Sequence, residues 1–516
     1  MRIVRPSEMA EIDRKTQEEF HIPGIVLMEN AGIKGFFRWM EISKRKGEVS
    51  KLLFAAGGGN NGGDALVMAR QAYTLLPESE VLVILAKRKL GELSRTHARA
   101  LDSLGIPVAV WEEEPERALG FIEASDVIFD GIAGTGLKGA LRSPLDSLVR
   151  AVNERKSFSE VVAIDVPSGI GEGFGPEMPS VSADITLTMG LPKTVLYTLN
   201  ARPRCGRIER VAVGFPPELI EKPPVGSTAS AHAAQGELIE GSRPLNVKDE
   251  AYKNTRGHTA VFSGAVGTTG AASLSASAAS RGGAGLVTLH CDSELYPLFA
   301  GKTEGVMVKP FDTDAQWSPE GFSSIVAGPG WGPQRGELLR SLVLSGLPGV
   351  ADADALRAAV EVAEDLTAEG GGEGLFGFWE ERWVLTPHPG EFSLISDVPR
   401  DELSSDPIAA VAEAAARVKA VVLLKGHVCT IGAPDGRYAI VDGMNPAMGT
   451  GGSGDVLSGV IGGLLAGGMD PFEAACRGAA VHQEAGRLAA EKTGWFSAEE
   501  LLPYISYLLW NGNTRV

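Results

Sequence analysis

A glycine-rich segment near the C-terminal end has the composition of a loop that binds an anion. Residues 445–455 read Asn-Pro-Ala-Met-Gly-Thr-Gly-Gly-Ser-Gly-Asp and lead into the apolar stretch 456–466. Glycines let the backbone approach a ligand closely, and the free N–H groups of a helix N-terminus favour negative charge. Asp455 stands at this turn, where a carboxylate could deprotonate a hydroxyl group during phosphoryl transfer. The segment is not a Walker A loop, because no Gly-Lys-Ser/Thr follows the glycines. The alternative interpretation is a plain glycine turn before a core helix.

Polar side chains also stand at strand ends in the first half of the chain. A predicted strand over 51–56 runs into the loop 57–64, Gly-Gly-Gly-Asn-Asn-Gly-Gly-Asp, and two later predicted strands end in Asp130 and Asp165. In open parallel sheets, ligands bind at the carboxyl ends of the strands. These three strand ends therefore predict one binding crevice, although Asp165 could alternatively cap the turn that follows it.

The second half repeats the alternation of short apolar runs and helical patterns. Residues 421–430 are predicted to form a strand that carries Lys425, and His388 lies between two prolines that fix its backbone. His388 could alternatively cap a turn. His482 lies in an apolar helical pattern and is predicted to pack rather than react.

The length, charge and cysteine spacing limit the class of protein. A chain of 516 residues is too long for one core, and the proline-rich stretch 222–230 predicts a boundary between domains at 1–220 and 221–516. A net charge of −17 argues against nucleic acid or an anionic membrane as a partner. Four separated cysteines, without Cys-x-x-Cys, suggest neither a disulfide framework nor a zinc site. With no apolar signal or membrane-spanning run, we expect a cytoplasmic protein.

Three ordered motifs of the first half resemble the YjeF N-terminal domain, an NAD(P)H-hydrate epimerase. They are Asn60-Asn61-Gly62-Gly63-Asp64, Asp130 with Gly134-Thr135-Gly136-Leu137, and Asp165-Val166-Pro167-Ser168-Gly169. The resemblance implies that Asn61, Asp130 and Ser168 hold a potassium ion, and these are the hard oxygen donors that such an ion prefers. It also implies a substrate that lies along two loops, with Asp165 handling the proton of the ring hydroxyl. The implied substrate residues are Asn60, Asn61, Gly62, Gly63, Asp64, Gly134, Thr135, Gly136, Leu137, Lys138, Gly139, Ala140 and Asp165. The family motif usually has glycine where Ala65 stands.

The second half resembles the YjeF C-terminal domain, an ADP- or ATP-dependent NAD(P)H-hydrate dehydratase. The segments Thr386–Glu391, Lys425-Gly426 and Gly451–Asp455 carry that resemblance. It implies nucleotide contacts at Lys425, Gly426, His427, Val428, Cys429 and Gly454. It implies hydrate contacts at Ala271, Ala272, Gly330, His388 and Asp455. Cys429 replaces the usual threonine, and residues 253–258 depart from the usual entry motif. No role is predicted for the His427 side chain.

Together, the two resemblances imply an α/β chain with a Rossmann-like three-layer N-terminal domain and a ribokinase-like C-terminal domain. The implied activity is repair of hydrated nicotinamide nucleotides, in which one domain interconverts the R and S epimers and the other dehydrates the S form. Asp455 would act as the base while ADP, accompanied by Mg²⁺ with unassigned ligands, becomes AMP and phosphate. The expected partners are NAD(P)H hydrates and ADP or AMP, and we expect a homo-oligomer. Alternatives are a small-molecule kinase of the ribokinase superfamily and a nucleotide-binding scaffold.

Overall fold

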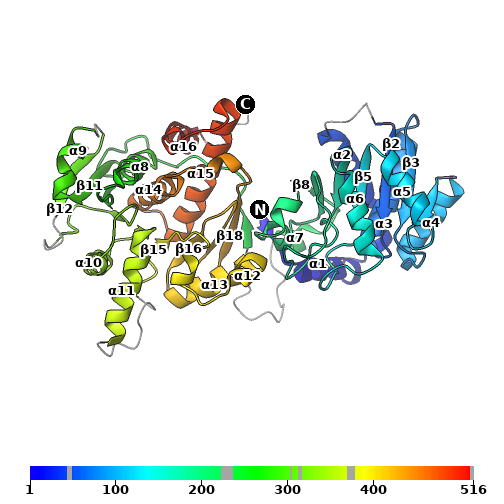
Figure 1. The fold of residues 1–516 in the computed structure, drawn as a ribbon, viewed down its shortest axis with the longest axis horizontal. Coiled ribbons are helices and arrows are strands. Elements are labelled where there is room, and N and C mark those ends of the chain that lie inside the picture. The colour runs from blue at the N-terminus through cyan, green and yellow to red at the C-terminus, as the bar shows by residue number, and fades with distance from the viewer. Residues whose placement is uncertain (44–48, 222–235, 303–304, 312–316, 369–377, 512–516) are drawn as a thin grey trace. The chain divides into compact units, whose positions relative to one another are not determined.

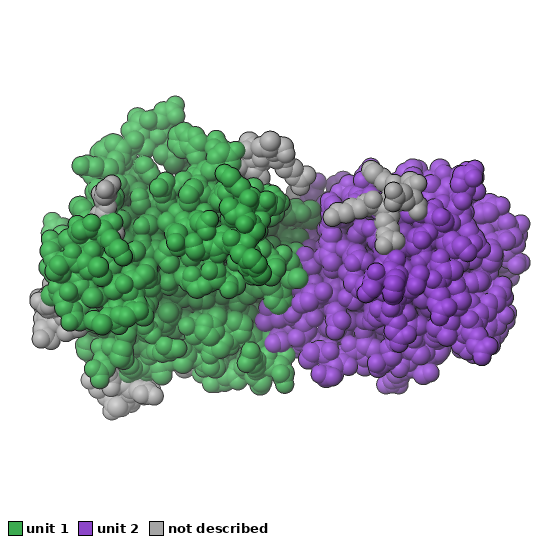
Figure 2. Space-filling model, turned by 45° about the horizontal axis from the view of Figure 1, so that its top comes forward, with its two compact units in different colours: residues 1, 229–403, 407–516 green, residues 2–228, 404–406 purple. Residues whose placement is uncertain are grey.

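The chain forms two compact units. The computed structural model describes residues 1–43, 49–221, 236–302, 305–311, 317–368 and 378–511. Unit 2 comprises residues 2–228 and 404–406, and unit 1 comprises residue 1, 229–403 and 407–516 (Figure 2). The predicted linker at 222–230 lies outside the described residues, so the predicted domain extents, 1–220 and 221–516, stay predictions.

Unit 2 is built on a parallel sheet with strand order β4-β3-β2-β5-β6-β7-β8 (Figure 1). Its strands are β2 (Lys51–Ala56), β3 (Glu80–Leu85), β4 (Val108–Val110), β5 (Val127–Gly131), β6 (Glu160–Ile164), β7 (Ile185–Met189) and β8 (Arg207–Val211), and a short strand, β1 (Arg2–Ile3), opens the chain. Its helices are α1 (Pro6–Glu18), α2 (Gly24–Ile42), α3 (Asn60–Leu75), α4 (Glu92–Ser103), α5 (Pro115–Ala124), α6 (Leu145–Arg155) and α7 (Pro217–Ile220).

Helices cover both faces of this sheet. Along β2, Leu52 and Phe54 join the hydrophobic core under α2 and α3, whereas Leu53 and Ala55 join the core under α5 and α6. Successive side chains of a strand point to opposite faces, so a strand with two buried faces reads as an unbroken apolar run. The three-layer α/β architecture expected for the first half is confirmed.

Unit 1 is built on a mixed sheet that contains the order β9-β18-β17-β16-β15-β14-β13-β10-β11-β12. Its strands are β9 (Gly236–Leu238), β10 (His258–Phe262), β11 (Leu286–Asp292), β12 (Met307–Phe311), β13 (Ser324–Ala327), β14 (Gly349–Ala351), β15 (Trp383–Leu385), β16 (Val421–Leu424), β17 (Val428–Gly432) and β18 (Tyr438–Asp442). Its helices are α8 (Thr269–Arg281), α9 (Tyr296–Ala300), α10 (Gly336–Leu344), α11 (Asp354–Ala368), α12 (Arg400–Ser405), α13 (Pro407–Val418), α14 (Ser453–Ala466), α15 (Pro471–Thr493) and α16 (Leu501–Asn511).

This sheet also lies between two helical layers. Val421 and Leu423 of β16 join a core with α14, α15 and α16, and Val422 and Leu424 join a core with α10, α11 and α13. Helices α14 and α8 pack so closely that the contact has no room for a side chain at Gly459. A Cβ atom at this position would lie 2.2 Å from the Ser275 carbonyl oxygen. The composition of small residues in both helices permits this approach, which fixes the position of the α14 N-terminus.

One predicted strand is wrong. Residues 421–430 do not form a single strand: β16 ends at Leu424, and β17 returns antiparallel to it from Val428. The chain reverses at residues 425–427, so Lys425 directly follows the end of β16, and residues 428–430 belong to β17.

The described residues show two further features. Cys205, Cys291, Cys429 and Cys476 are all free thiols and all buried. No helix in the described part of the chain combines the length and the apolar character needed to cross a bilayer.

The core of unit 2 depends on a group of aromatic side chains around Phe129. This side chain is fully buried and stacks on Phe54 with ring centroids 4.5 Å apart, while Trp39 meets it edge-on at 5.1 Å. We predict that Phe129→Ala lowers the free energy of unfolding by about 3–5 kcal/mol, because the truncation leaves a cavity. Chemical denaturation followed by circular dichroism measures this, with Phe158→Ala, at a side chain that is 63% exposed, as control. Equal stability of the two variants would contradict the prediction.

Candidate functional site

A cavity of about 610 Å³ lies at the carboxyl edge of the sheet in unit 2. It is lined by the N-terminus of α3 and by the loops that follow β5 and β6. The predicted residues that line it are Asn60, Asn61, Gly62, Asp64, Gly134, Thr135, Gly136, Leu137 and Asp165. Gly63, Lys138, Gly139 and Ala140 are not among the lining residues. A Cβ atom on Gly62 would lie 2.0 Å from the Gly57 carbonyl oxygen, so the tight entry into α3 requires glycine.

Two of the three residues predicted to hold potassium contact the Ala133 peptide, and the third, Asp130, is hydrogen-bonded to Ser168. Asn61 Nδ2 and Ser168 Oγ donate to the Ala133 carbonyl oxygen at 3.2 and 3.0 Å. The Ser168 N–H donates to Asp130 Oδ2 at 2.8 Å, and burial raises the pKa of Asp130 to about 6. Asn61 Oδ1 is buried and has no hydrogen-bond donor. A buried carboxylate beside an unpaired amide oxygen fits a monovalent cation.

Asp165 lies between the end of β6 and the cavity, and its φ is +66°. Its Oδ1 accepts from the Met189 N–H at 3.0 Å and from Lys193 Nζ. The Lys193 side chain is only 1% exposed, and it also donates to Thr188 Oγ1 at 3.2 Å and to the Met189 carbonyl oxygen. Sequence reasoning missed Lys193, because nothing in its local sequence ties it to Asp165.

Two more carboxyl groups line the same cavity. Burial, and then the negative charges of Asp165 and Asp13, raise the pKa of Asp64 well above its usual value, and Lys193 offsets this only in part. Burial also raises the pKa of Asp13, against the effect of its hydrogen bond from Gln17. The cavity therefore combines three carboxyl groups with one ammonium group.

The glycine loop of unit 1 leads into α14 as predicted. Gly452, with φ +91°, precedes the helix, and Asp455 is the third residue of α14. Burial and the nearby charge of Asp352 raise the pKa of Asp455 to about 6, against the opposing effect of Lys425. Asp455 is thus a carboxylate at neutral pH with increased basicity, which suits a general base.

Lys425 links this site to two acids that sequence reasoning did not assign. Its Nζ lies 2.6 Å from Asp352 Oδ1 and 3.9 Å from Glu391 Oε2. Burial lowers the pKa of Lys425, but the charges of Asp352, Glu391 and Asp455 outweigh it and raise the pKa. A Cβ atom on Gly454 would lie 3.5 Å from Lys425 Nζ. Asp352 directly follows β14, and this position at a strand end is the signal that could have identified it.

The predicted hydrate contacts lie on the loops that contain Gly330 and His388 and in the first turns of α8 and α14. His388 is largely exposed, and its Nδ1 accepts from the Gly390 N–H at 2.8 Å. Thr268 Oγ1 donates to the Gly330 carbonyl oxygen at 2.7 Å, and Ala271 lies beside Gly330. Ala272 is fully buried in the core beneath, so its side chain offers no surface to a ligand.

The predicted nucleotide contacts follow the turn between β16 and β17. Gly426 is exposed and His427 is partly exposed, whereas Val428 and Cys429 are buried. Gln483 Nε2 lies 3.7 Å from Cys429 Sγ, and burial raises the pKa of this thiol. His482 is buried, and burial lowers its pKa to about 4, so it stays neutral.

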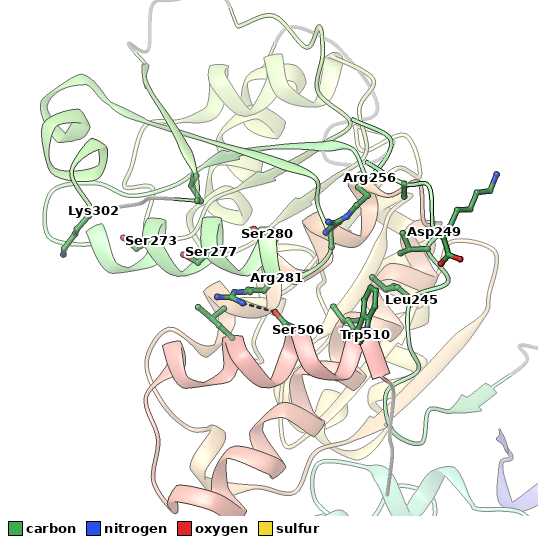
Figure 3. Close-up of a pocket in the computed structure, with 18 residues that line it drawn as sticks. Leu245, Asp249, Arg256, Ser273, Ser277, Ser280, Arg281, Lys302, Ser506 and Trp510 are labelled. Atoms are coloured by element: carbon green, nitrogen blue, oxygen red, sulfur yellow. Dashed lines mark hydrogen bonds between the residues drawn. The ribbon is translucent and has the colours of Figure 1, made fainter. Parts of the chain in front are cut away.

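Unit 1 also contains a larger cavity that does not belong to this site. It measures about 930 Å³ and lies along α8 and α16, where Arg281 donates to Ser506 Oγ at 3.5 Å (Figure 3). None of the predicted site residues lines it. Cavity volume therefore does not identify the reactive centre of unit 1.

Two family models match the chain, one within each of the two units. Residues 24–195 match the family described as YjeF-related protein N-terminus, and residues 259–506 match the family described as NAD(P)H-hydrate dehydratase. A crystal structure of the ADP/ATP-dependent NAD(P)H-hydrate dehydratase from Bacillus subtilis, co-crystallised with ATP/Mg²⁺, is 26% identical. That match covers 52% of this chain and 93% of that chain, with a TM-score of 0.45.

Curated relatives match over nearly the full chain. The bifunctional NAD(P)H-hydrate repair enzyme of Moorella thermoacetica is 32% identical over 545 residues, which cover 99% of this chain and 97% of that protein. The enzyme of the same description from Coxiella burnetii is 32% identical over 473 residues, with 90% and 91% covered. The chain therefore belongs to the family of bifunctional NAD(P)H-hydrate repair enzymes.

Proposed function

We propose that this chain restores NAD(P)H from its hydrates, with epimerisation in unit 2 and nucleotide-dependent dehydration in unit 1. The observation that carries the proposal is the match to bifunctional repair enzymes across 99% of the chain. Each unit adds a cluster of acids at the carboxyl edge of its own sheet, which is where α/β enzymes bind ligands. The substrates are small molecules, namely the hydrates and a nucleoside diphosphate or triphosphate.

In unit 1, Asp455 is assigned the role of general base. The hydrated ring carries a hydroxyl group at C6, and hydroxide leaves poorly. Asp455 accepts the hydroxyl proton while the oxygen attacks the terminal phosphoryl group of ADP, releasing AMP. Phosphate then leaves as the lone pair of the ring nitrogen forms a C=N bond, and loss of a proton from C5 restores NAD(P)H. The N–H groups of residues 451–454, at the start of α14, would stabilise the phosphoryl charge.

The nucleotide is assigned to the surface that begins at Lys425. The ammonium group of Lys425 is held by Asp352 and lies next to Gly454, so it can offset the charge of a phosphate. Among the described residues, no group of three or more His, Cys, Asp or Glu side chains could form a metal cage. This fits Mg²⁺ that arrives with the nucleotide, since Mg²⁺ commonly keeps waters and binds substrate phosphates. When bound, it would neutralise phosphate charge; its protein ligands stay unassigned.

In unit 2, Asp165 is assigned the role of handling the proton of the ring hydroxyl group. The substrate would lie along residues 60–64 and 134–140, against the cavity wall. Asn61, Asp130 and Ser168 would hold a potassium ion, which when bound would neutralise the buried Asp130 and order the Ala133 peptide. The unpaired Asn61 Oδ1 supports this assignment. We further propose that ADP is preferred over ATP and that the protein works in the cytoplasm as a homo-oligomer.

The competing functions make different products. A ribokinase-superfamily kinase would leave a stable phosphorylated product and no recovery of reduced nicotinamide absorbance. A nucleotide-binding scaffold would change neither epimer. Incubating the full chain with mixed hydrate epimers and ADP tests all three, and the proposal expects complete recovery of NADH absorbance.

Asp455→Asn is predicted to lower dehydration by at least about 100-fold, because the amide cannot accept the hydroxyl proton. The rate is measured as the recovery of NADH absorbance from the hydrate with ADP. Asp397→Asn, at a side chain that is 87% exposed in the same unit, is the control and keeps the wild-type rate. Full recovery by Asp455→Asn would refute the assigned base.

The pH profile of dehydration is predicted to have its acidic limb near pH 6. The pKa of Asp455 is raised to about 6, so the group holds its proton to a higher pH than an ordinary aspartate does. The base is thus available above pH 6, and kcat/KM falls about tenfold per pH unit below it. Rates with the S epimer alone isolate unit 1. A profile that stays flat down to pH 5 would argue against Asp455 as the base.

Removal of potassium is predicted to slow epimerisation and lower the thermal unfolding temperature of unit 2. Without a cation, the Asp130 carboxylate is buried without a compensating charge, which is costly. For the test, K⁺ is replaced by N-methylglucamine at constant ionic strength. Chromatography of the epimers measures the epimerisation rate, and calorimetry measures the unfolding temperature. Asp130→Asn should abolish the response to potassium. An unchanged response in this variant would exclude the assigned ligands.

A further inference from the structure

The four charged side chains of the unit 2 cavity come from four separate segments. Asp13 lies on α1, Asp64 on α3, Asp165 after β6, and Lys193 after β7. The three carboxyl groups outnumber the one ammonium group. Which acid is paired decides how protons are distributed among them.

Lys193 is hydrogen-bonded to Asp165 through its ammonium group. Its ammonium group has three protons, and the structure provides three acceptors: Asp165 Oδ1, Thr188 Oγ1 and the Met189 carbonyl oxygen. The side chain is 1% exposed, so water does not compete for these protons. All three ammonium protons are therefore used inside the protein, and one of them is directed at Asp165.

Only one oxygen of Asp165 is used by the protein. Both the Lys193 ammonium group and the Met189 N–H donate to Oδ1. In the described parts of the chain, no group donates to Oδ2, while Asp165 lines the cavity. The second oxygen is therefore left for a ligand.

Asp64, unlike Asp165, is not paired with any lysine that the structure describes. Its carboxyl group lines the cavity and has no hydrogen bond or ion pair with any described residue. Burial, Asp165 and Asp13 raise its pKa, and Lys193 only partly opposes them. Asp64 thus holds its proton to a higher pH than an ordinary aspartate does. Two carboxyl groups with such different environments are the arrangement from which enzymes build an acid and a base.

We propose that Asp64 and Asp165 form the acid–base pair of the epimerase, and that Lys193 is the positioning residue that keeps Asp165 as the base. This inference rests on the epimerase function proposed above. It assigns different roles to two acids of one cavity, and it explains why a fully buried lysine is present there.

The pair can interconvert the epimers by opening and closing the ring. Asp165 takes the proton of the C6 hydroxyl group, the O–H electrons form the C6=O bond, and the C6–N1 bond breaks. Its electrons pass to N1, which takes the proton of Asp64. After rotation about C5–C6, N1 adds to the other face of C6. The N1 proton returns to Asp64, and the oxygen takes the proton of Asp165.

Both carboxyl groups then regain their starting protonation states, and no oxidant or reductant is consumed. One form of the enzyme therefore accepts either epimer, which a reversible interconversion requires. A fixed ion pair between Lys193 and Asp165 is compatible with this cycle, because Asp165 begins every turnover as a carboxylate.

The test uses the full chain without nucleotide, so that only interconversion takes place. Starting from one purified epimer of NADH hydrate, chromatography measures the appearance of the other, with the spontaneous rate subtracted. Asp64→Asn keeps the side-chain size and is expected to lower kcat by about 100-fold or more, with KM within about threefold. Lys193→Met is expected to lower kcat and to move the acidic limb of kcat/KM to higher pH, because Asp165 loses its cation.

Matched controls are Asp102→Asn and Lys34→Met, at exposed side chains of the same unit, which keep the wild-type rate. Wild-type kcat in Asp64→Asn would overturn the acid–base pair while leaving the epimerase function intact. An inactive wild-type protein would overturn the function and the inference together. A Lys193→Met protein that is less stable but has an unshifted pH profile would reduce Lys193 to a structural role. If Lys193→Met does not fold, Asp64→Asn alone decides.

Discussion

A buried pair of lysine and aspartate lies at the carboxyl edge of the sheet in each unit, and both sites depend on it. In unit 2 the pair is Lys193 with Asp165, and in unit 1 it is Lys425 with Asp352. An unpaired charge in such a place would be costly, whereas a hydrogen-bonded pair is tolerated. Each pair leaves a second carboxyl group nearby, Asp64 or Asp455, without a cation of its own. In each unit, burial and the negative charge of the paired aspartate raise the pKa of this second acid, and the lysine opposes them only in part.

The fold and much of both sites could be predicted from the sequence, for a definite physical reason. Parallel strands bring their carboxyl ends to one edge, so polar residues that follow separate strands converge without any knowledge of packing. Asn61 and Ser168 meet at one peptide in this way, with Asp130 hydrogen-bonded to Ser168, and the glycines before Asp455 mark the start of α14. The family resemblance then supplied the roles of these residues, which stay predictions.

Other features depend on tertiary contacts that no local pattern reveals. Lys193 reaches Asp165 across 28 residues of sequence, and Lys425 reaches Asp352 across 73. The turn at Lys425 was missed because the apolar run on both sides of it reads as one strand. Asp352 also follows a strand but was given no role, since its partner could not be identified from the sequence. Burial and pairing, which decide the proton affinity of an acid, appear only in three dimensions.

The four buried cysteines have a consequence for the durability of the protein. Burial raises the pKa of Cys291 to about 11 and also raises the pKa values of Cys429 and Cys476. Peroxides and electrophiles attack the thiolate form, and protonated, inaccessible thiols react slowly. The cysteines of this protein are thereby shielded from such reagents for as long as the fold stays intact.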